Sequence, residues 1–190
     1  MMIDRRQSII QAATKSFSLF GYKATTMDQV AKIANVGKGT IYTFFKNKEE
    51  LFDQIVSTMI IEMKEVAERA MDGRQSFFEK AHHALYRILE FRTEHQLMIK
   101  LLQEEKEMGT PAVQEVLEQV ETTIVSYIKQ KIEEAIEKGE IRECDPEITA
   151  FLLFKIYIAL VSDWEKRHES LSKEKIAELI ELYFLRGLSV

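Results

Sequence analysis

The chain has 190 residues, 46% hydrophobic and 30% charged, which is enough apolar material for a buried core and unlike the composition of a disordered protein. Its one cysteine, Cys144, excludes an intrachain disulfide framework. The longest apolar stretch, residues 150–161, contains a lysine and is too short to span a bilayer, and the N-terminus lacks a signal-peptide pattern. We therefore expect a cytoplasmic protein without a membrane partner.

The net charge of −5 is unevenly distributed along the chain. Residues 1–50 contain eight Lys and Arg against four Asp and Glu, whereas residues 51–190 contain eighteen against twenty-seven. A basic N-terminal segment on an acidic body is a charge asymmetry that favours nucleic-acid binding at one end of the molecule. A chance fluctuation would give the same numbers, so this observation needs support from motifs.

Apolar residues at helical spacing predict helices from the start of the chain. The first helix ends at Gly21, where the periodic pattern stops. Thr26 begins a capping box in front of a short second helix at about 27–34. A tight turn containing Gly37 then leads to a third short helix at about 39–45.

Longer helices follow, and no segment has the alternating pattern of a strand, so the predicted fold class is all-α. A single helix is expected between the two glycines that interrupt the pattern before residue 110. The predicted boundaries are N-terminal caps and glycine stops, with caps at Asn47, Thr110, Asp145 and Ser172, and stops at Gly73, Gly109 and Gly139.

The glycines around Lys38 raise the possibility of a phosphate-binding cofactor loop. The Walker spacing requires a glycine five residues before Gly37 and a Ser or Thr directly after Lys38, and both are absent. The Rossmann spacing lacks its third glycine, and a helix precedes the turn where either motif needs a strand. The sequence therefore predicts no cofactor.

Two short helices joined by a turn fit a DNA-binding helix-turn-helix and also fit ordinary packing helices. Gly39 leaves the start of the third helix without a side chain, so that backbone can approach a phosphate closely. Ile41 and Phe45 are four residues apart and are expected to face inward. The outward set then contains two aromatic rings, which favours a partner surface; it is Lys38, Thr40, Tyr42, Thr43 and Phe44.

The segment "TTMDQVAKIANVGKGTIYTFFKNKEELF", with "SFSLFGYKATT" overlapping it upstream, resembles the DNA-binding segment of TetR-family transcriptional regulators. The resemblance covers about the first 55 residues; beyond them, only length, helical content and "KGEIRECDPEI" are similar to the family. It implies an Ω-shaped homodimer of about nine helices per chain. A DNA-binding domain would span residues 1–47, and residues 48–190 would bind a small-molecule effector and dimerise.

The same resemblance implies a non-enzymatic regulator, most often a repressor, that binds double-stranded DNA at a palindromic operator and is released by its effector. It places Thr26 and Lys48 on backbone phosphates, and Tyr42 on a phosphate as the family's usual aromatic contact. Gly37 stands where relatives often have a hydroxyl residue, and Phe44 where many have His or Tyr. The full predicted DNA-contacting set is Thr26, Gly37, Lys38, Gly39, Thr40, Tyr42, Thr43, Phe44 and Lys48.

Two other classes of protein are open alternatives. Glu79-x-x-His82 and Glu165-x-x-His168 match the Glu-x-x-His motif of ferritin-like di-iron bundles. Glu79, however, points away from the apolar stripe of its own helix, so we expect no metal site. A helical adaptor whose basic segment binds protein is the other alternative.

The family places its ligand cavity among the middle helices, and an apolar or amphipathic effector is expected there. The predicted walls are Phe91, Met98, Leu102, Tyr127 and Phe154. Residues 148–164 and the last helix are apolar nearly all round, and this surplus predicts a second buried face in a homodimer. The predicted interface is Phe151, Phe154, Tyr157, Ile158, Val161, Trp164, Leu179, Tyr183 and Phe184.

Overall fold

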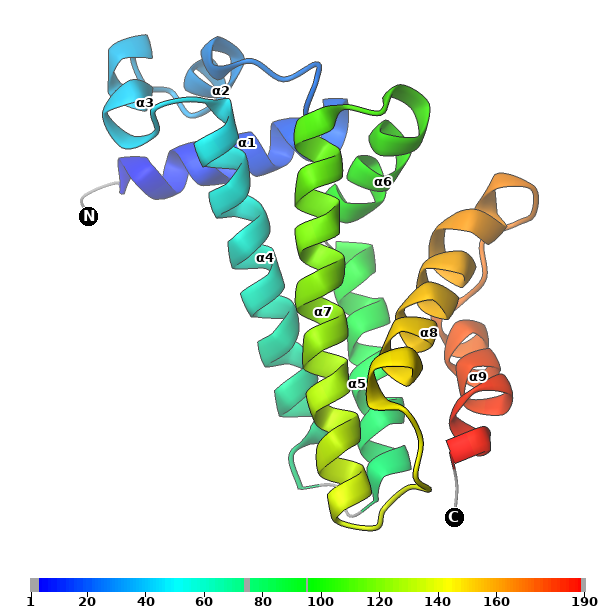
Figure 1. Cartoon of the computed structure of the whole chain (residues 1–190). Helices are drawn as coiled ribbons and strands as arrows, with labels where there is room; N and C mark the ends of the chain where they lie inside the picture. The colour runs from blue at the N-terminus through cyan, green and yellow to red at the C-terminus, as the bar shows by residue number, and fades with distance from the viewer. Residues whose placement is uncertain (1–3, 74–75, 95, 189–190) are drawn as a thin grey trace. The chain divides into compact units, whose positions relative to one another are not determined.

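A computed structural model of the chain describes residues 4–73, 76–94 and 96–188, and the regular structure in these ranges is entirely helical (Figure 1). The predicted all-α fold class is therefore confirmed. The main helices are α1 (Arg5–Phe20), α2 (Met27–Ile33), α3 (Lys38–Phe44), α4 (Lys48–Met71), α5 (Phe77–Glu94), α6 (Leu97–Met108), α7 (Pro111–Glu137), α8 (Pro146–Ile158) and α9 (Lys173–Tyr183). A π-helical turn (Ala159–Asp163) and a 3-10 turn (Trp164–Lys166) follow α8, and a second 3-10 turn (Leu185–Leu188) follows α9.

Side chains cap the helices at Thr26, Asn47, Asp145 and Ser172 as predicted, whereas the hydroxyl of the fifth predicted cap, Thr110, donates to Glu104. The Thr26 hydroxyl accepts a hydrogen bond from the Gln29 backbone N–H, and the Gln29 side chain accepts from the Thr26 N–H, which completes the capping box. The Asn47 side chain accepts from the Glu50 N–H at the start of α4. Asp145 and Ser172 cap α8 and α9 in the same way. Each cap satisfies backbone donors that the helix itself leaves unpaired.

The segment between Gly73 and Gly109 differs from the prediction. It contains two helices, α5 and α6, instead of one. No glycine or proline stands at the junction, and apolar residues recur at helical spacing on both sides of it. The sequence therefore lacks the usual signal for a break at this point.

The chain folds into two compact units. Unit 1 comprises Met1–Glu62 and His95–Glu118, and unit 2 comprises Met63–Glu94 and Gln119–Val190. The first part of α4, all of α6 and the first turns of α7 thus pack with the helix-turn-helix segment. The proposed functional boundary at 47/48 coincides with the start of α4 and stays a prediction.

The core of unit 1 is built around aromatic rings. Phe17 from α1 meets the ring of Phe52 from α4 edge-on at 5.3 Å, and Tyr22 lies 4.6 Å from Phe52 between centroids. In this unit α1 packs against α2 and α6, and α2 packs against α3. Burial of these rings holds α1 against α4, and α2 and α3 are attached to this pair through the contact of α2 with α1.

A buried carboxyl group holds the turn between α1 and α2. Glu104 of α6 is only 4% exposed and accepts hydrogen bonds from the backbone N–H groups of Tyr22 (2.6 Å) and Lys23 (2.9 Å). Its Oε1 atom also accepts from the Thr110 hydroxyl at 2.9 Å. Gly21 lies at φ 85°, ψ 170°, a region open essentially to glycine alone, and a Cβ atom there would overlap Oε2 of Glu104.

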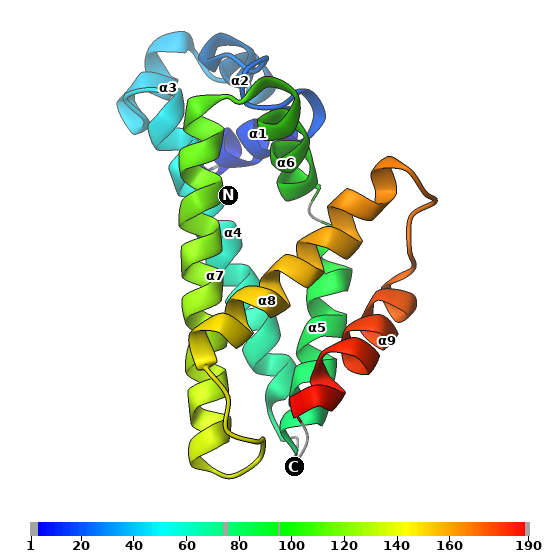
Figure 2. The ribbon, with the colours of Figure 1, turned by 45° about the vertical axis from the view of Figure 1, so that its right-hand side comes forward.

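Unit 2 is a helical layer structure in which α9 packs on α5 and α8 (Figure 2). One buried cluster joins Leu89 of α5 to Val161 and Ile180. A second cluster joins Ile132 of α7 to Ala150 of α8 and further residues. Within the described part of the chain, no helix combines the length and the apolar character needed to cross a membrane.

We predict that Gly21→Ala lowers the free energy of unfolding more than Gly139→Ala does. Both glycines have positive φ, so each substitution carries a conformational cost of roughly 1–3 kcal/mol, and the ψ of 170° puts Gly21 at the upper end of that range. Only at position 21 does the added methyl group also displace the Glu104 carboxyl group; at Gly139 it meets nothing within 4 Å. Urea unfolding followed by circular dichroism measures the difference, and equal losses would contradict the role assigned to Glu104.

Candidate nucleic-acid interface and ligand cavity

The turn between α2 and α3 is closed by backbone hydrogen bonds. Asn35 takes a left-handed conformation, with φ 54°, which asparagine adopts more readily than most residues. The Val36 N–H donates to the Ala31 carbonyl at 3.0 Å, which ends α2 in a tight turn. Gly37 precedes α3 at the N-cap position and, as a glycine, provides no side-chain hydrogen bond to the helix.

The two faces of α3 differ as the sequence predicts. Ile41 and Phe45 are 0% and 2% exposed, whereas Tyr42 and Phe44 are 46% and 38% exposed. The other outward residues lie as expected, with Lys38, Gly39 and Thr43 exposed and Thr40 half-buried. The outer face of α3, which we define as residues 38–40 and 42–44, therefore presents hydroxyls and rings without covering any of the core of unit 1.

Packing within unit 1 does not require a glycine at position 39. A Cβ atom at this position would meet nothing within 4 Å. Glycine inside a helix is less favourable than alanine by roughly 0.5–1 kcal/mol. The residue thus weakens a seven-residue helix without a packing benefit within unit 1.

Two lysines near α3 are placed differently from one another. Lys38 is exposed and forms an ion pair with Asp28 of α2 at 2.9 Å, and this hydrogen bond raises the pKa of Lys38. Lys48 was predicted on a DNA phosphate, but its ammonium group points into unit 1. It donates to the backbone carbonyls of Tyr22 (3.0 Å) and Thr25 (3.1 Å) and lies 4.1 Å from the centroid of the Tyr22 ring.

The position of Lys48 corrects its assigned role. Burial lowers its pKa, and two of its three donors are used by the turn that precedes α2. Lys48 therefore acts first as a structural clamp on this turn, and a phosphate contact through its third donor stays a prediction. Thr26 is exposed at the start of α2, where its hydroxyl accepts from the Gln29 N–H and donates to the Gln29 side chain, and its phosphate contact also stays a prediction.

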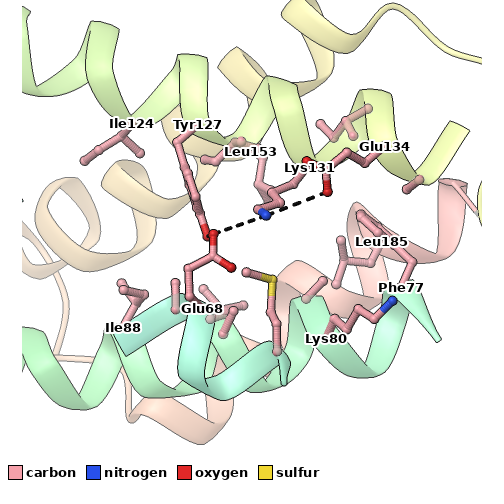
Figure 3. A pocket seen from close by; sticks show the side chains of 18 of the residues that line it. Glu68, Phe77, Lys80, Ile88, Ile124, Tyr127, Lys131, Glu134, Leu153 and Leu185 are labelled. Carbon is pink, nitrogen blue, oxygen red and sulfur yellow. Dashed lines mark hydrogen bonds and ion pairs between the residues drawn. The ribbon is translucent and has the colours of Figure 1, made fainter. Parts of the chain in front are cut away.

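Unit 2 encloses a cavity of about 660 Å³, within the range of small-molecule sites. Its walls come from α4, α5, α7, α8 and α9 and are mainly aliphatic and aromatic. A polar cluster lies on one wall (Figure 3): the Glu68 carboxylate accepts a hydrogen bond from the Tyr127 hydroxyl at 2.8 Å and pairs with Lys131 at 3.1 Å. Lys131 also lies 3.7 Å from Glu134.

The titration of this cluster follows from its geometry. Burial raises the pKa of the Tyr127 hydroxyl, and the hydrogen bond to Glu68 adds to the rise. Burial also acts to raise the pKa of Glu68, but the bonds from Tyr127 and Lys131 outweigh it, and the net shift is downward. At neutral pH the cluster therefore contains an ionised carboxylate and a protonated phenol.

The cavity contains two of the five predicted wall residues, whose contact with a ligand stays a prediction. Tyr127 and Phe154 line it. Phe91 is buried elsewhere in unit 2, and Met98 and Leu102 belong to unit 1, so these three do not line this cavity. The sequence analysis missed the polar residues of the wall, among them Glu68, Lys80 and Lys131. They are spread over three helices, and the ordinary charged positions of a surface helix look the same in sequence.

The surface of α8 and α9 also corrects part of the predicted interface. Phe154 and Val161 are buried in unit 2, while Tyr157 and Phe184 pack on its core and line the cavity. These four do not offer a free surface. Ile158 and Leu179 are half-buried, whereas Phe151, Trp164 and Tyr183 are exposed as predicted. Further exposed apolar residues accompany them: Ile148, Leu152 and Leu182.

The residues of the two Glu-x-x-His motifs make other contacts. Glu79 bonds Ser76 at the start of α5, and His82 pairs with Glu181 at 3.3 Å. His168 stacks on Trp164 with 3.8 Å between centroids. In the ranges that the structure describes, no group of three or more His, Cys, Asp or Glu side chains is arranged to hold a metal ion.

Comparisons with known proteins decide the family. The sequence profile described as "Bacterial regulatory proteins, tetR family" matches residues 9–55, and that of the "Tetracyclin repressor-like, C-terminal domain" matches residues 75–188. The HTH-type transcriptional regulator YhgD of Bacillus subtilis (strain 168) is 62% identical over 189 residues, covering 100% of this chain and 99% of YhgD. The chain belongs to the TetR family of transcriptional regulators.

Solved structures of other proteins share the fold of this TetR-family regulator. FadR from Bacillus subtilis in complex with stearoyl-CoA gives a TM-score of 0.76 at 21% identity, covering 92% of this chain and 96% of FadR. AibR in complex with isovaleryl coenzyme A and operator DNA gives a TM-score of 0.69 at 20% identity, covering 95% of this chain and 98% of AibR. At these identities the likeness is one of fold.

We predict that Lys38→Met and Lys48→Met have different effects in this TetR-family regulator. Lys38 leads the exposed face of α3, where a lysine can reach guanine O6 and N7, so its loss should weaken operator binding about tenfold to a hundredfold and random-duplex binding much less. Lys48→Met should lower thermal stability as well, because it removes the donor to two partly buried carbonyls. Competition binding and thermal melting measure both; an unchanged specificity ratio for Lys38→Met would make Lys38 a backbone contact.

A second prediction concerns Gly39. Gly39→Ala should stabilise unit 1 slightly, by roughly 0.5–1 kcal/mol, because alanine favours the helix and the methyl group meets no neighbour. The same change should weaken DNA binding if the backbone of α3 approaches DNA closely. Thermal melting and duplex binding should therefore move in opposite directions, and a variant that is more stable with unchanged affinity would remove Gly39 from the interface.

Proposed function

We propose that this TetR-family regulator is a repressor that binds a palindromic operator as a homodimer and is released when a small molecule enters the cavity of unit 2. The exposed outer face of α3 is the observation that carries the DNA-binding half of the proposal. Two aromatic rings stay in solvent there while Ile41 and Phe45 of the same helix are buried. A surface of this kind gains most of its stabilisation from a partner.

Dimerisation is proposed through exposed apolar residues of α8 and α9. Ile148, Phe151 and Leu152 are 58%, 43% and 45% exposed and recur at helical spacing on α8, and Leu182 and Tyr183 are 42% and 76% exposed on α9. The two helices pack on one another within unit 2. A two-fold pairing of this helix pair with a second copy would bury these residues in a four-helix arrangement.

The effector is proposed to be an acyl compound, free or as a thioester. The cavity is apolar over most of its wall, with a polar cluster at Tyr127, and a ligand with an aliphatic chain and a polar head matches that division. FadR and AibR, which share the fold, are described with stearoyl-CoA and isovaleryl coenzyme A. Effector binding would favour a conformation of the dimer in which the two α3 helices no longer match the operator.

Selection of duplexes from a random-sequence pool tests the proposed function. The intact protein should enrich an inverted repeat whose half-sites are about one helical turn, roughly 34–36 Å, apart. Enrichment of a single asymmetric half-site, or of no sequence, would contradict the proposal.

Leu152→Glu provides the matching test of the dimer. A charge within the proposed interface should give a monomer in analytical ultracentrifugation and abolish enrichment of the inverted repeat. Ile61→Glu is the control, because Ile61 is an exposed apolar residue too, at 58% against 45% for Leu152, but lies on α4 in unit 1. A dimeric Leu152→Glu protein would place the interface elsewhere.

A further inference from the structure

We propose that the cavity of unit 2 recognises an amphiphile with an aliphatic chain and an anionic head group, and that this head group replaces the Glu68 carboxylate on Tyr127 and Lys131. The inference rests on the proposed function in taking this cavity as the effector site. It adds the charge of the ligand and the residues that select it.

The first observation is that two hydrogen-bond donors on the polar wall of the cavity share one acceptor from the protein itself. The Tyr127 hydroxyl and the Lys131 ammonium both donate to Glu68, at 2.8 and 3.1 Å (Figure 3). The Lys64 ammonium lies 5.6 Å from the centroid of the Tyr127 ring, as does that of Lys131. A phenol O–H and an ammonium group that meet at one oxygen form a donor set that binds a carboxylate or phosphate oxygen.

The second observation is the balance of charge around the cavity. Its lining contains more Lys and Arg than Asp and Glu, although the chain beyond residue 50 has a large excess of acidic residues. Glu134 and Glu140 each lie within ion-pair distance of a lysine, as Glu68 does. Among the residues that the structure describes, Lys64 and Lys138 have no carboxylate within 4 Å. A cationic head group would have to compete with lysines for these three glutamates, and Asp72 is the one acid of the described lining outside these pairs. An anionic head group finds two lysines, Lys64 and Lys138, without an ion-pair partner among the described residues.

The third observation is that the Glu68 carboxylate has space in solvent to move away from Tyr127 and Lys131. Its side chain is 50% exposed, so the displaced carboxylate can turn into solvent instead of being buried without a partner. The Glu68 carboxylate therefore acts as a stand-in for the head group of the ligand. It accepts hydrogen bonds from Tyr127 and Lys131 and is exchanged for an external anion of the same chemistry.

The exchange has a consequence for regulation. Glu68 belongs to α4, and Tyr127 and Lys131 belong to α7, so the stand-in bonds tie these two helices together within unit 2. An external anion on Tyr127 and Lys131 removes the direct bonds between these α7 donors and Glu68 of α4. Because the N-terminal part of α4 belongs to unit 1, the loss of this tie acts on the helix that is continuous with the DNA-binding unit.

Four probes with the same twelve-carbon chain test the head-group preference by isothermal titration calorimetry on the full-length protein, below their micellar concentrations. Dodecanoate and dodecanoyl-coenzyme A should bind, and whichever is tighter identifies a free carboxylate or a thioester as the source of the anionic head. Dodecanol should bind about tenfold or more weakly, and dodecyltrimethylammonium more weakly still. Equal binding of all probes, preference for the cationic one, or no binding of either anionic probe would overturn the proposal.

Variants test the exchange with Glu68. Lys131→Met should weaken dodecanoate binding about tenfold or more, whereas Glu68→Gln should strengthen it, because an amide competes for Lys131 less well than a carboxylate. If the two substitutions change dodecanoate affinity in opposite directions, the effect is one of recognition, because damage to the fold of unit 2 would weaken binding by both variants. Lys129→Met is the matched control: Lys129 lies on α7 but pairs with Glu147 and does not line the cavity. Unchanged or weaker binding by Glu68→Gln would overturn the stand-in role.

Operator affinity is measured separately with and without dodecanoate. Binding of dodecanoate with the predicted variant effects but no change in operator affinity would support the site and contradict the proposed release of DNA. Loss of operator affinity without binding in calorimetry would contradict the site and leave the proposed function in place.

Discussion

The arrangement of the DNA-binding helices depends on the carboxyl group of Glu104. It satisfies two backbone N–H groups of the turn between α1 and α2, and its own burial is offset by three hydrogen bonds. The carbonyls of the same turn are satisfied from another direction by Lys48 of α4. The buried N–H of Tyr22 would otherwise cost roughly 1–3 kcal/mol, and the other three groups, which are partly buried, would cost less. The turn that sets the position of α2 is thus fixed by α4 and α6 together.

The sequence predicts local structure in this chain better than it predicts partners across space. The caps at Thr26, Asp145 and Ser172, and the buried and exposed faces of α3, depend on neighbours within a few residues, and the predictions for them are confirmed. Glu104 stands in the acidic run "QEEKE" and reads as a solvated residue. Its contact with Tyr22 spans 82 positions, and no local pattern indicates it.

The apolar residues of α8 illustrate a different limit. Residues 148–164 are apolar on nearly every side, so the period that normally separates a buried from an exposed face is absent. The structure shows that opposite faces of this helix have different surroundings. Leu153, Phe154 and Tyr157 line the cavity, whereas Ile148 and Leu152 lie in solvent. One helix therefore contacts both the cavity and the proposed dimer surface, and only the three-dimensional packing shows which residue serves which.

The stacking of Trp164 on His168 makes this region spectroscopically distinctive. Trp164 is the chain's one tryptophan, it is 40% exposed, and the imidazole lies 3.8 Å from it. Its fluorescence therefore arises from a single place, just beyond the end of α8, and an imidazolium in contact with an indole quenches emission. Burial of Trp164 by a second copy would shift the emission to shorter wavelength without any added dye. Intrinsic tryptophan fluorescence would in that case report on association of the protein.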